Sequence, residues 1–516
     1  MFSADMARNL GDTIDRSDPQ RVAMIDCRDW EHPVERTYAE MDHEAHAVAA
    51  GLLAAGLRPG AAIGLCAENR SEYITAFFGI MRAGMVAVPI SHRFPTATIG
   101  FILNDADVVL TFCDAVGRAQ LPKGAPLIEF DAAGAAGFAA FVQPDRPYAV
   151  HEAPDEAFAM VLYTSGSTGM PKGVPLTHGG HLWVLEMRMK AFRAGPQRVL
   201  VVAPMYHMNA LCTSLYTLAV GSTVILLPKF DARRFTEAIE RFTCDVVTIV
   251  PTMLAMMLLE PETLDRTNLA SVKTLRMGSA PVSDRLWDEA HRLFPGAFIQ
   301  NAYGTTEAGP AVFGPDPKGN AFPPGACGWP LPGIDLRLVD ERGADADEGV
   351  LWMRSPANSP GYLNLPEKTA AVFTKDNWYV SGDIFKRDAI GAFHFVGRAD
   401  DMFVCGGENI YPSEVEITLE LHPEIIQSCV VPVSDDIKGA KPFAFVVREQ
   451  RSTLTEDAVR AFSLEKGPAY RHPRAVIFLR ELPYAGPGKI DRRSLQADAQ
   501  RIWNERENRQ DTASQR

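Results

Sequence analysis

Residues 163–174 read YTSGSTGMPKGV, and the interpretation of the whole chain starts from this stretch. It follows the apolar run FAMVLY and precedes a helix-like segment that Thr177 could cap. Glycines allow a backbone to approach an anion closely, N–H and hydroxyl groups donate to phosphate oxygens, and Lys172 supplies a positive charge. The pattern GxxxxGK[ST] is absent, so this is not a Walker A loop. Taken alone, the stretch fits either a phosphate-binding loop or a surface turn.

Around this loop, from about residue 60 to 305, short apolar runs alternate with helix-like stretches. Runs such as TLRMGS (274–279) lack the alternation of a half-buried strand, which is typical of parallel sheets covered on both faces. We expect helix N-caps at Ser71, Asp231 and Ser283, each just before apolar residues at helical spacing. The alternation predicts stacked α/β layers.

The pattern changes after about residue 330. DLRLVD (335–340) and GVLWMR (349–354) indicate short antiparallel strands of a small sheet or barrel. The predicted fold is therefore α/β, with a large N-terminal domain of stacked αβ subdomains plus a small β-barrel-like subdomain, hinged to a small α+β C-terminal domain. We place the N-terminal domain at 1–397, the hinge at 398–401 and the mobile C-terminal domain at 402–516.

Composition argues against several classes of protein. The chain has 516 residues, of which 47% are apolar and 22% charged, as in an ordinary globular protein of more than one domain. A formal charge of −13 argues against nucleic-acid binding. The eight cysteines contain no CxxC pair, which fits a reducing compartment better than a disulfide framework or a zinc site. We find no signal-peptide pattern and no apolar run near the ~20 residues that span a bilayer. We expect a cytoplasmic protein without a membrane span, either a monomer or a homo-oligomer such as a dimer.

Seven more motifs follow the loop in chain order. They are PMYHMNA (204–210), GSAPVS (278–283), NAYGTTEAGP (301–310), YVSGDIF (379–385), FVGRADD (395–401), CGGENIYPSEVE (405–416) and LPYAGPGKIDRRSL (482–495). Each alone has an ordinary structural interpretation, such as a polar loop or a hairpin turn. Together with YTSGSTGMPKGV they closely resemble, in order, the motifs of the adenylate-forming superfamily. That superfamily includes acyl-CoA synthetases, peptide-synthetase adenylation domains and luciferases, and the resemblance covers about residues 20 to 495.

The resemblance implies which residues bind ATP and Mg²⁺. For the phosphates these are Thr164, Ser165, Gly166, Ser167, Thr168, Gly169 and Lys172. Ala280 and Pro281 are implied to pack on adenine, Asn301 to meet its amine and Tyr303 to stack on its ring. Gly304 and Thr305 belong to the same motif; Thr306 is implied to bind the α-phosphate, Glu307 to hold Mg²⁺, and Asp383 and Arg398 to bind the ribose.

It also implies the catalytic, CoA-binding and acid-binding residues. Lys489 matches the catalytic lysine that bridges the substrate carboxylate and the α-phosphate, and His207 matches a gating position beside the acid. Asp400 matches the hinge residue, and Gly406, Gly407 and Glu408 match the loop of the pantetheine tunnel. The expected acid pocket consists of His207, Met208, Asn209, Val250, Gly278 and Ala302.

We therefore expect an AMP-forming acid–CoA ligase that uses ATP, Mg²⁺ and coenzyme A. The pocket segments 207–216 and 250–259 are apolar and contain neither Lys nor Arg, so a second carboxylate would find no partner there. This favours a small monocarboxylic acid, compact and aromatic or short and branched. Thr305 in YGTTE resembles benzoate-type ligases. The alternatives are an enzyme that loads the phosphopantetheine of a carrier protein, and a catalytically inactive nucleotide-binding scaffold.

Overall fold

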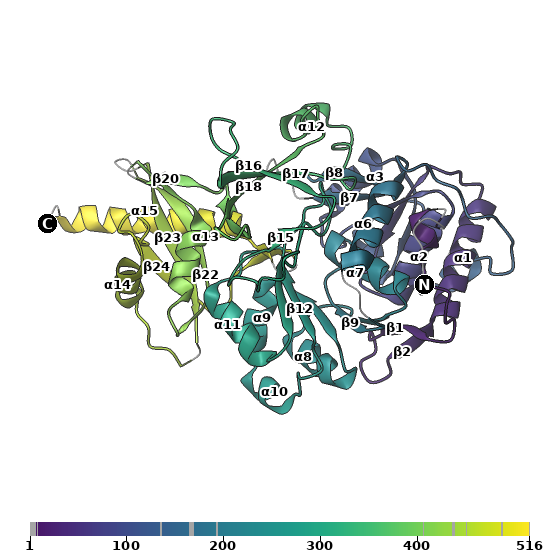
Figure 1. The fold of residues 1–516 in the computed structure, drawn as a ribbon, viewed down its shortest axis with the longest axis horizontal. Helices are drawn as coiled ribbons and strands as arrows, with labels where there is room; N and C mark the ends of the chain where they lie inside the picture. Colours follow the sequence, from purple (N-terminus) through teal and green to yellow (C-terminus); the bar gives the residue numbers. More distant parts are fainter. Residues whose placement is uncertain are drawn as a thin grey trace.

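The computed structural model describes residues 7, 9–134, 137–164, 170–191, 195–405, 407–435, 439–449, 451–486 and 489–514, without the side chains of 485, 486, 489 and 507–514. Figure 1 shows the N-terminal half (purple to teal) on the right and the C-terminal unit (light green to yellow) on the left.

Two mostly parallel sheets form the N-terminal half. The seven-stranded sheet has the order β13 (Phe298–Ala302), β12 (Thr274–Gly278), β11 (Val246–Ile249), β9 (Arg198–Val201), β10 (Thr223–Leu226), β1 (Val22–Asp26), β2 (Val34–Thr37). The six-stranded sheet has the order β6 (Leu127–Glu129), β5 (Val108–Cys113), β3 (Ala62–Cys66), β4 (Val86–Pro89), β7 (Phe158–Thr164), β8 (Lys172–Thr177). Only the edge pairs β1–β2 and β7–β8 are antiparallel. The turn from β7 to β8 is thus the site of YTSGSTGMPKGV.

Helices cover both faces of these sheets. The layer shared by the two sheets contains α1 (Tyr38–Ala54), α2 (Ser71–Arg82), α6 (His178–Ala191) and α7 (Met208–Ala219). On the other face of the seven-stranded sheet lie α8 (Ala232–Arg241), α9 (Pro251–Leu258), α10 (Pro261–Arg266) and α11 (Asp284–Leu293). The short helices near the six-stranded sheet are α3 (Thr96–Asp105), α4 (Ala115–Gln120) and α5 (Phe138–Phe141). The parallel strands are buried on both faces, which explains their continuous apolar sequence.

Two of the expected N-caps are confirmed and one is wrong. Asp231 accepts a hydrogen bond from the backbone N–H of Arg234, and Ser283 accepts one from Leu286. Ser71 is instead the first residue of α2, whose N-cap is Arg70. The backbone N–H of Ser71 donates to the carboxylate of Asp26 at 2.9 Å, so a side chain from β1 supplies the acceptor that a cap would have provided.

Three smaller groups of strands follow. An antiparallel sheet contains β16 (Asp335–Val339), β17 (Glu348–Arg354), β18 (Tyr379–Arg387) and β19 (Phe393–Arg398), with α12 (Pro366–Val372) against β18. The pair β14 (Phe313–Gly314) and β15 (Trp329–Pro330) precedes it. The C-terminal unit has β20 (Phe403–Cys405), β21 (Glu408–Ile410), β22 (Ile425–Asp435), β23 (Gly439–Arg448), β24 (Ala475–Leu479), the hairpin β25 (Tyr484–Gly486) and β26 (Lys489–Ile490), and helices α13 (Pro412–Glu420), α14 (Glu456–Lys466) and α15 (Arg492–Ser514). The predicted α/β fold with a smaller C-terminal α+β unit is confirmed.

The C-terminal unit packs on the outer helices of the seven-stranded sheet. Ile426, Phe443 and Leu482 belong to the same buried cluster as side chains of α9 and α11. Strand β19 ends at Arg398 and β20 begins at Phe403, so the predicted hinge lies between two sheets. The mobility of this connection stays a prediction. In the part of the chain that the structure describes, no helix is both long and apolar enough to cross a membrane.

Candidate active site

A chain of polar contacts joins the end of β13 to β18 and β19. The hydroxyl of Tyr303 donates to Asp383 Oδ2 at 2.5 Å, and Arg398 Nη1 donates to Asp383 Oδ1 at 3.0 Å. Arg398 Nε also donates to Asp400 Oδ1 at 2.8 Å. Burial raises the pKa of the Asp383 carboxyl above its usual value, although Tyr303 and Arg398 act in the opposite direction. Three separate motifs of the sequence therefore meet at one buried carboxylate.

A second cluster lies around Glu307. This carboxylate is buried, with 8% of its surface exposed, and its Oε1 accepts a hydrogen bond from the Tyr362 hydroxyl at 2.9 Å. The ammonium of Lys172 lies 4.2 Å from the centre of the Tyr362 ring. Burial lowers the pKa of Lys172, and the nearby charge of Glu307 opposes that shift. The lysine of the β7–β8 turn and the glutamate of the 301–310 motif thus share one aromatic neighbour.

The start of the β7–β8 turn has an unsatisfied hydroxyl. Thr164 Oγ1 is buried and has no hydrogen-bond partner among the described residues. A buried donor of this kind is uncommon and suits a ligand oxygen. Ser165–Gly169 and Gly406, which we also expect to bind ligands, lie outside the described residues. Of this motif, the structure describes residues 163–164 before the gap and residues 170–174 after it.

The carboxyl ends of β12 and β13 lie beside the Asp383 and Glu307 clusters. A side chain on Gly278 would place its Cβ 2.5 Å from the carbonyl oxygen of Ala302, so the close approach of the two strands requires glycine. The next residue, Ser279, has a φ of 67°, and this left-handed turn leads to Ala280 and Pro281 at the surface. In β13, Asn301 Nδ2 donates to the carbonyl oxygen of Gly325 at 3.0 Å.

The expected acid-pocket residues come from the neighbouring helices. His207 is the exposed N-cap of α7, with its ring 4.6 Å from that of Tyr206. Met208 is buried in the first turn, and Asn209 accepts a hydrogen bond from Thr213 at 3.3 Å. Val250 is the buried N-cap of α9. Met208 belongs to the buried cluster of the layer shared by the two sheets, and Val250 to the cluster on the outer face of the seven-stranded sheet.

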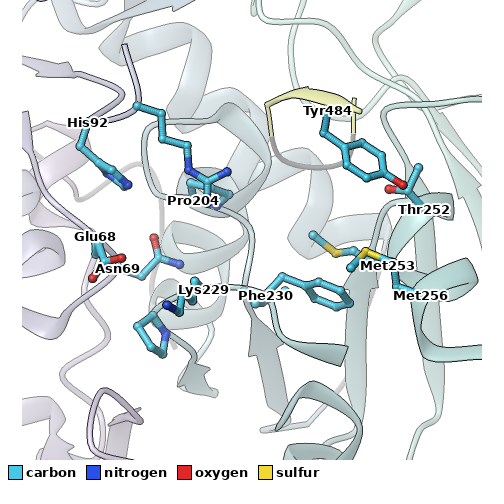
Figure 2. A pocket seen from close by; sticks show the side chains of 13 residues that line it. Glu68, Asn69, His92, Pro204, Lys229, Phe230, Thr252, Met253, Met256 and Tyr484 are labelled. Carbon is cyan, nitrogen blue, oxygen red and sulfur yellow. The ribbon is translucent and has the colours of Figure 1, made fainter. Parts of the chain in front are cut away.

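The hairpin β25–β26, where Lys489 lies, faces the N-terminal half. Figure 2 shows Tyr484 of this hairpin across a pocket from Asn69, His92 and Phe230. The cavity has a volume of about 170 Å³. Lys489 pairs with Gly486 in the hairpin. In the C-terminal sheet, Gly407 has a φ of 91° and Glu408 is exposed in β21.

Comparison with known proteins decides the family. The model of the AMP-binding enzyme family matches residues 12–363, and that of the AMP-binding enzyme C-terminal domain matches residues 414–489. The chain belongs to the AMP-binding enzyme family. A feruloyl-CoA synthase from Amycolatopsis is 34% identical over 466 residues, which are 88% of this chain and 92% of that protein. A 4-coumarate–CoA ligase from Nicotiana tabacum is 30% identical and covers 89% of each chain.

Solved structures of AMP-binding enzymes match nearly the whole chain. The anthranilate CoA ligase AuaEII in complex with anthranoyl-AMP has a TM-score of 0.88 at 26% identity and covers 98% of this chain and 100% of its own. ATP-bound MatB from Rhodopseudomonas palustris has a TM-score of 0.85 at 28% identity, with 96% and 100% covered. The chain is an acid–CoA ligase of the AMP-forming type, and the carrier-protein alternative is not favoured.

Sequence reasoning missed Tyr362, which contacts both Glu307 and Lys172, and two arginines beside the α7 side chains. Tyr362 lies in the unremarkable turn SPGYLN, and no spacing connected it with Glu307 or Lys172. Arg276 lies within TLRMGS, and an arginine in a strand predicted to be buried was a signal that could have been used. Arg188 lies on α6, outside every motif.

Proposed function

We propose that this enzyme activates a small carboxylic acid with ATP and transfers the acyl group to coenzyme A. In the first step a carboxylate oxygen of the acid attacks the α-phosphorus, the bond to the β-phosphate breaks, and pyrophosphate leaves acyl-AMP behind. In the second step the CoA thiol attacks the acyl carbonyl, AMP leaves, and the thiol proton is released. The observation that carries the proposal is the convergence of Lys172, Glu307 and Asp383 from three motifs on one site.

The first step requires two anions to meet, so it depends on positioning and on neutralised charge. Lys172 and the hydroxyl of Thr164 hold the departing β- and γ-phosphates, and Thr306 contacts the α-phosphate. Lys489 bridges the acid and the α-phosphate. Asp383 and Arg398 bind the ribose hydroxyls, and Ala280, Pro281, Asn301 and Tyr303 hold the adenine. These assignments follow the family's motifs and agree with the contacts around Glu307 and Asp383.

The residues fit a single Mg²⁺ ion bound mainly through ATP. Among the described residues, no three His, Cys, Asp or Glu side chains gather as a metal cage. Mg²⁺ commonly uses one or two carboxylates together with phosphate oxygens and water. Glu307 supplies such a carboxylate next to Lys172, and the ion, when bound, would offset charge on the phosphates.

The second step uses the other face of the C-terminal domain. The motif at 405–416 provides Gly406, Gly407 and Glu408 for the pantetheine arm, and the chain turns about Asp400 to bring them to the site. We assign the hairpin that contains Lys489 to the first step; its Tyr484 lines a pocket together with residues of the N-terminal half. His207, exposed at the N-terminus of α7, gates the acid.

The substrate we propose is compact, either aromatic or short and branched. Gly278 lies in close contact with Ala302, and the expected pocket residues Met208 and Val250 are both buried and apolar. The relatives named as feruloyl-CoA, 4-coumarate and anthranilate ligases support an aromatic acid. Thr305, which resembles the residue of benzoate-type ligases, favours a benzoate-like acid over the longer cinnamate-like acids.

The decisive experiment measures ATP–pyrophosphate exchange and CoA-dependent AMP release with a panel of acids. The panel spans short, branched, benzoate-like, cinnamate-like and long-chain acids. We expect exchange and thioester formation with compact acids. Exchange without a CoA thioester would favour carrier loading, and no exchange with any acid would favour an inactive scaffold.

A further inference from the structure

Two arginines lie behind the expected acid pocket. Arg188 is on α6 and has 6% of its surface exposed. Its guanidinium lies 4.3 Å from the centre of the Tyr216 ring on α7. Among the described residues, Arg188 forms no ion pair and no hydrogen bond. A buried guanidinium without an anion is costly, because burial removes its hydration.

Arg276 faces the same space from the sheet. Leu275 and Met277 pack with α9 and α11 on one face of β12, so the alternating residues Arg276 and Gly278 point to the layer that contains α6 and α7. Burial and the nearby charge of Arg188 lower the pKa of Arg276 to about 9. Two cations from different elements, Arg188 buried and Arg276 half-buried, therefore lie close to each other.

A third polar group faces this region. Thr248 on β11 is the cross-strand neighbour of Arg276 and lies on the same face of the sheet. Its hydroxyl oxygen is buried and has no hydrogen-bond partner among the described residues. The unsatisfied hydroxyl and the unpaired guanidinium of Arg188 are independent observations, and both suit an oxygen of a ligand.

The distance along the strand matches a compact acid. Arg276 precedes Gly278 by two residues, which is about 6.6 Å in an extended strand. Gly278 is the residue expected beside the acid at the carboxyl end of β12, where the ATP clusters lie. A molecule about the size of one aromatic ring could place its reacting carboxylate at that end and its opposite end against Arg276.

We propose that Arg188, Arg276 and Thr248 form a subsite for an anionic oxygen group at the far end of the acid. This inference rests on the proposed function and narrows its substrate to acids with a second carboxylate or an ionised phenol. Guanidinium groups bind such oxygens through charge-assisted hydrogen bonds. It replaces the expectation of a plain monocarboxylic acid, which considered segments 207–216 and 250–259, Gly278 and residues 302–305, but neither Arg188 nor Arg276.

The test compares acids that differ at the far end alone. We choose benzoate, 4-hydroxybenzoate and benzene-1,4-dicarboxylate, with butanoate and butanedioate as an aliphatic pair. For the wild-type enzyme we expect kcat/KM at least about 10-fold higher for one of the oxygen-bearing acids than for its plain partner. The preferred acid shows whether the group is a phenol or a carboxylate.

Variants then test which residues cause the preference for the oxygen-bearing acid over its plain partner. Arg188→Met and Arg276→Met should each reduce this ratio of kcat/KM values at least about 10-fold, and Thr248→Val should reduce it less. Arg188→Lys should retain part of it. Lys190→Met removes a charge from the exposed side of the same helix and should leave it unchanged. If the arginine variants fail to fold, the rise in the unfolding temperature of the wild-type enzyme with each acid reports the same preference.

Failure of the proposed subsite and failure of the proposed ligase function give different results. Thioester formation with plain acids at equal or higher kcat/KM, unchanged in the arginine variants, would overturn the subsite and leave the ligase function intact. Absence of pyrophosphate exchange with every acid would overturn the proposed function and the subsite with it.

Discussion

Substitution of the single residue Asp383 tests whether this carboxylate binds the ribose of ATP. Its carboxylate is 6% exposed and already accepts hydrogen bonds from Tyr303 and Arg398. Asp383→Asn removes the charge that would hold the ribose, so we expect the KM for ATP in pyrophosphate exchange to rise at least about 10-fold. Asp388→Asn, in a turn of the same sheet, is the control. An unchanged KM for ATP would contradict the ribose assignment.

Two substitutions of Tyr362 distinguish the effect of its hydrogen bond to Glu307 from the effect of its ring contact with Lys172. Tyr362→Phe deletes the hydrogen bond to Glu307 but retains the ring next to Lys172, whereas Tyr362→Ala deletes both. A buried hydrogen bond to a charged group contributes about 1.5–3 kcal/mol, so we expect Tyr362→Phe to slow acyl-AMP formation roughly 10- to 100-fold. Tyr362→Ala should be slower still. Equal rates for wild type and Tyr362→Phe in single-turnover assays would show that this contact does not position Glu307.

At the level of elements, the contact between β12 and β13 depends on Gly278. A Cβ there would lie 2.5 Å from the backbone oxygen of Ala302, so Gly278→Ala must separate two central strands. We expect a loss of about 1–3 kcal/mol in the free energy of unfolding, measured with denaturant. Gly100→Ala in α3 is the matched control, because its Cβ would have 3.4 Å of space. That variant should gain up to about 1 kcal/mol. The reverse order of stabilities would exclude the close approach.

The whole molecule contains a titratable contact between its two halves. Glu420 of α13 accepts hydrogen bonds from Ser428 and from Ser283, the N-cap of α11. Burial raises its pKa from 4.5 to about 7. The carboxyl therefore ionises more readily in the unfolded chain, and the folded state loses stability as the pH rises from 4.5 to 7, by at most about 3 kcal/mol.

Glu420→Gln should remove that pH dependence. We expect its unfolding temperature to change less than that of the wild type between pH 4.5 and 7. Glu465→Gln, an exposed position on α14, should retain the wild-type profile. Identical profiles for Glu420→Gln and the wild type would show that this carboxyl does not titrate in the contact.

The two-step reaction makes a prediction for Lys489. If the C-terminal domain presents this lysine only during the first step, Lys489→Ala should abolish acyl-AMP formation, a loss of at least about 100-fold. The same variant should largely retain thioester formation from supplied acyl-AMP. Lys466→Ala on α14 is a control for the loss of one positive charge. Equal loss in both half-reactions would contradict the assignment.

The sequence by itself determined the α/β class, the change to antiparallel strands after about residue 330, and the family. Fold class follows from local patterns of burial, and motifs such as YTSGSTGMPKGV are contiguous. Tertiary structure alone decided which distant residues meet. Tyr362 contacts Glu307 across 55 positions, and Arg188 and Arg276 converge from a helix and a strand. The backbone N–H of Ser71 donates to Asp26 on β1, and local capping rules could not predict an acceptor so distant in the sequence. Such contacts depend on how the helix and sheet layers pack, and neither motif spacing nor composition predicts which side chains of different layers come close together.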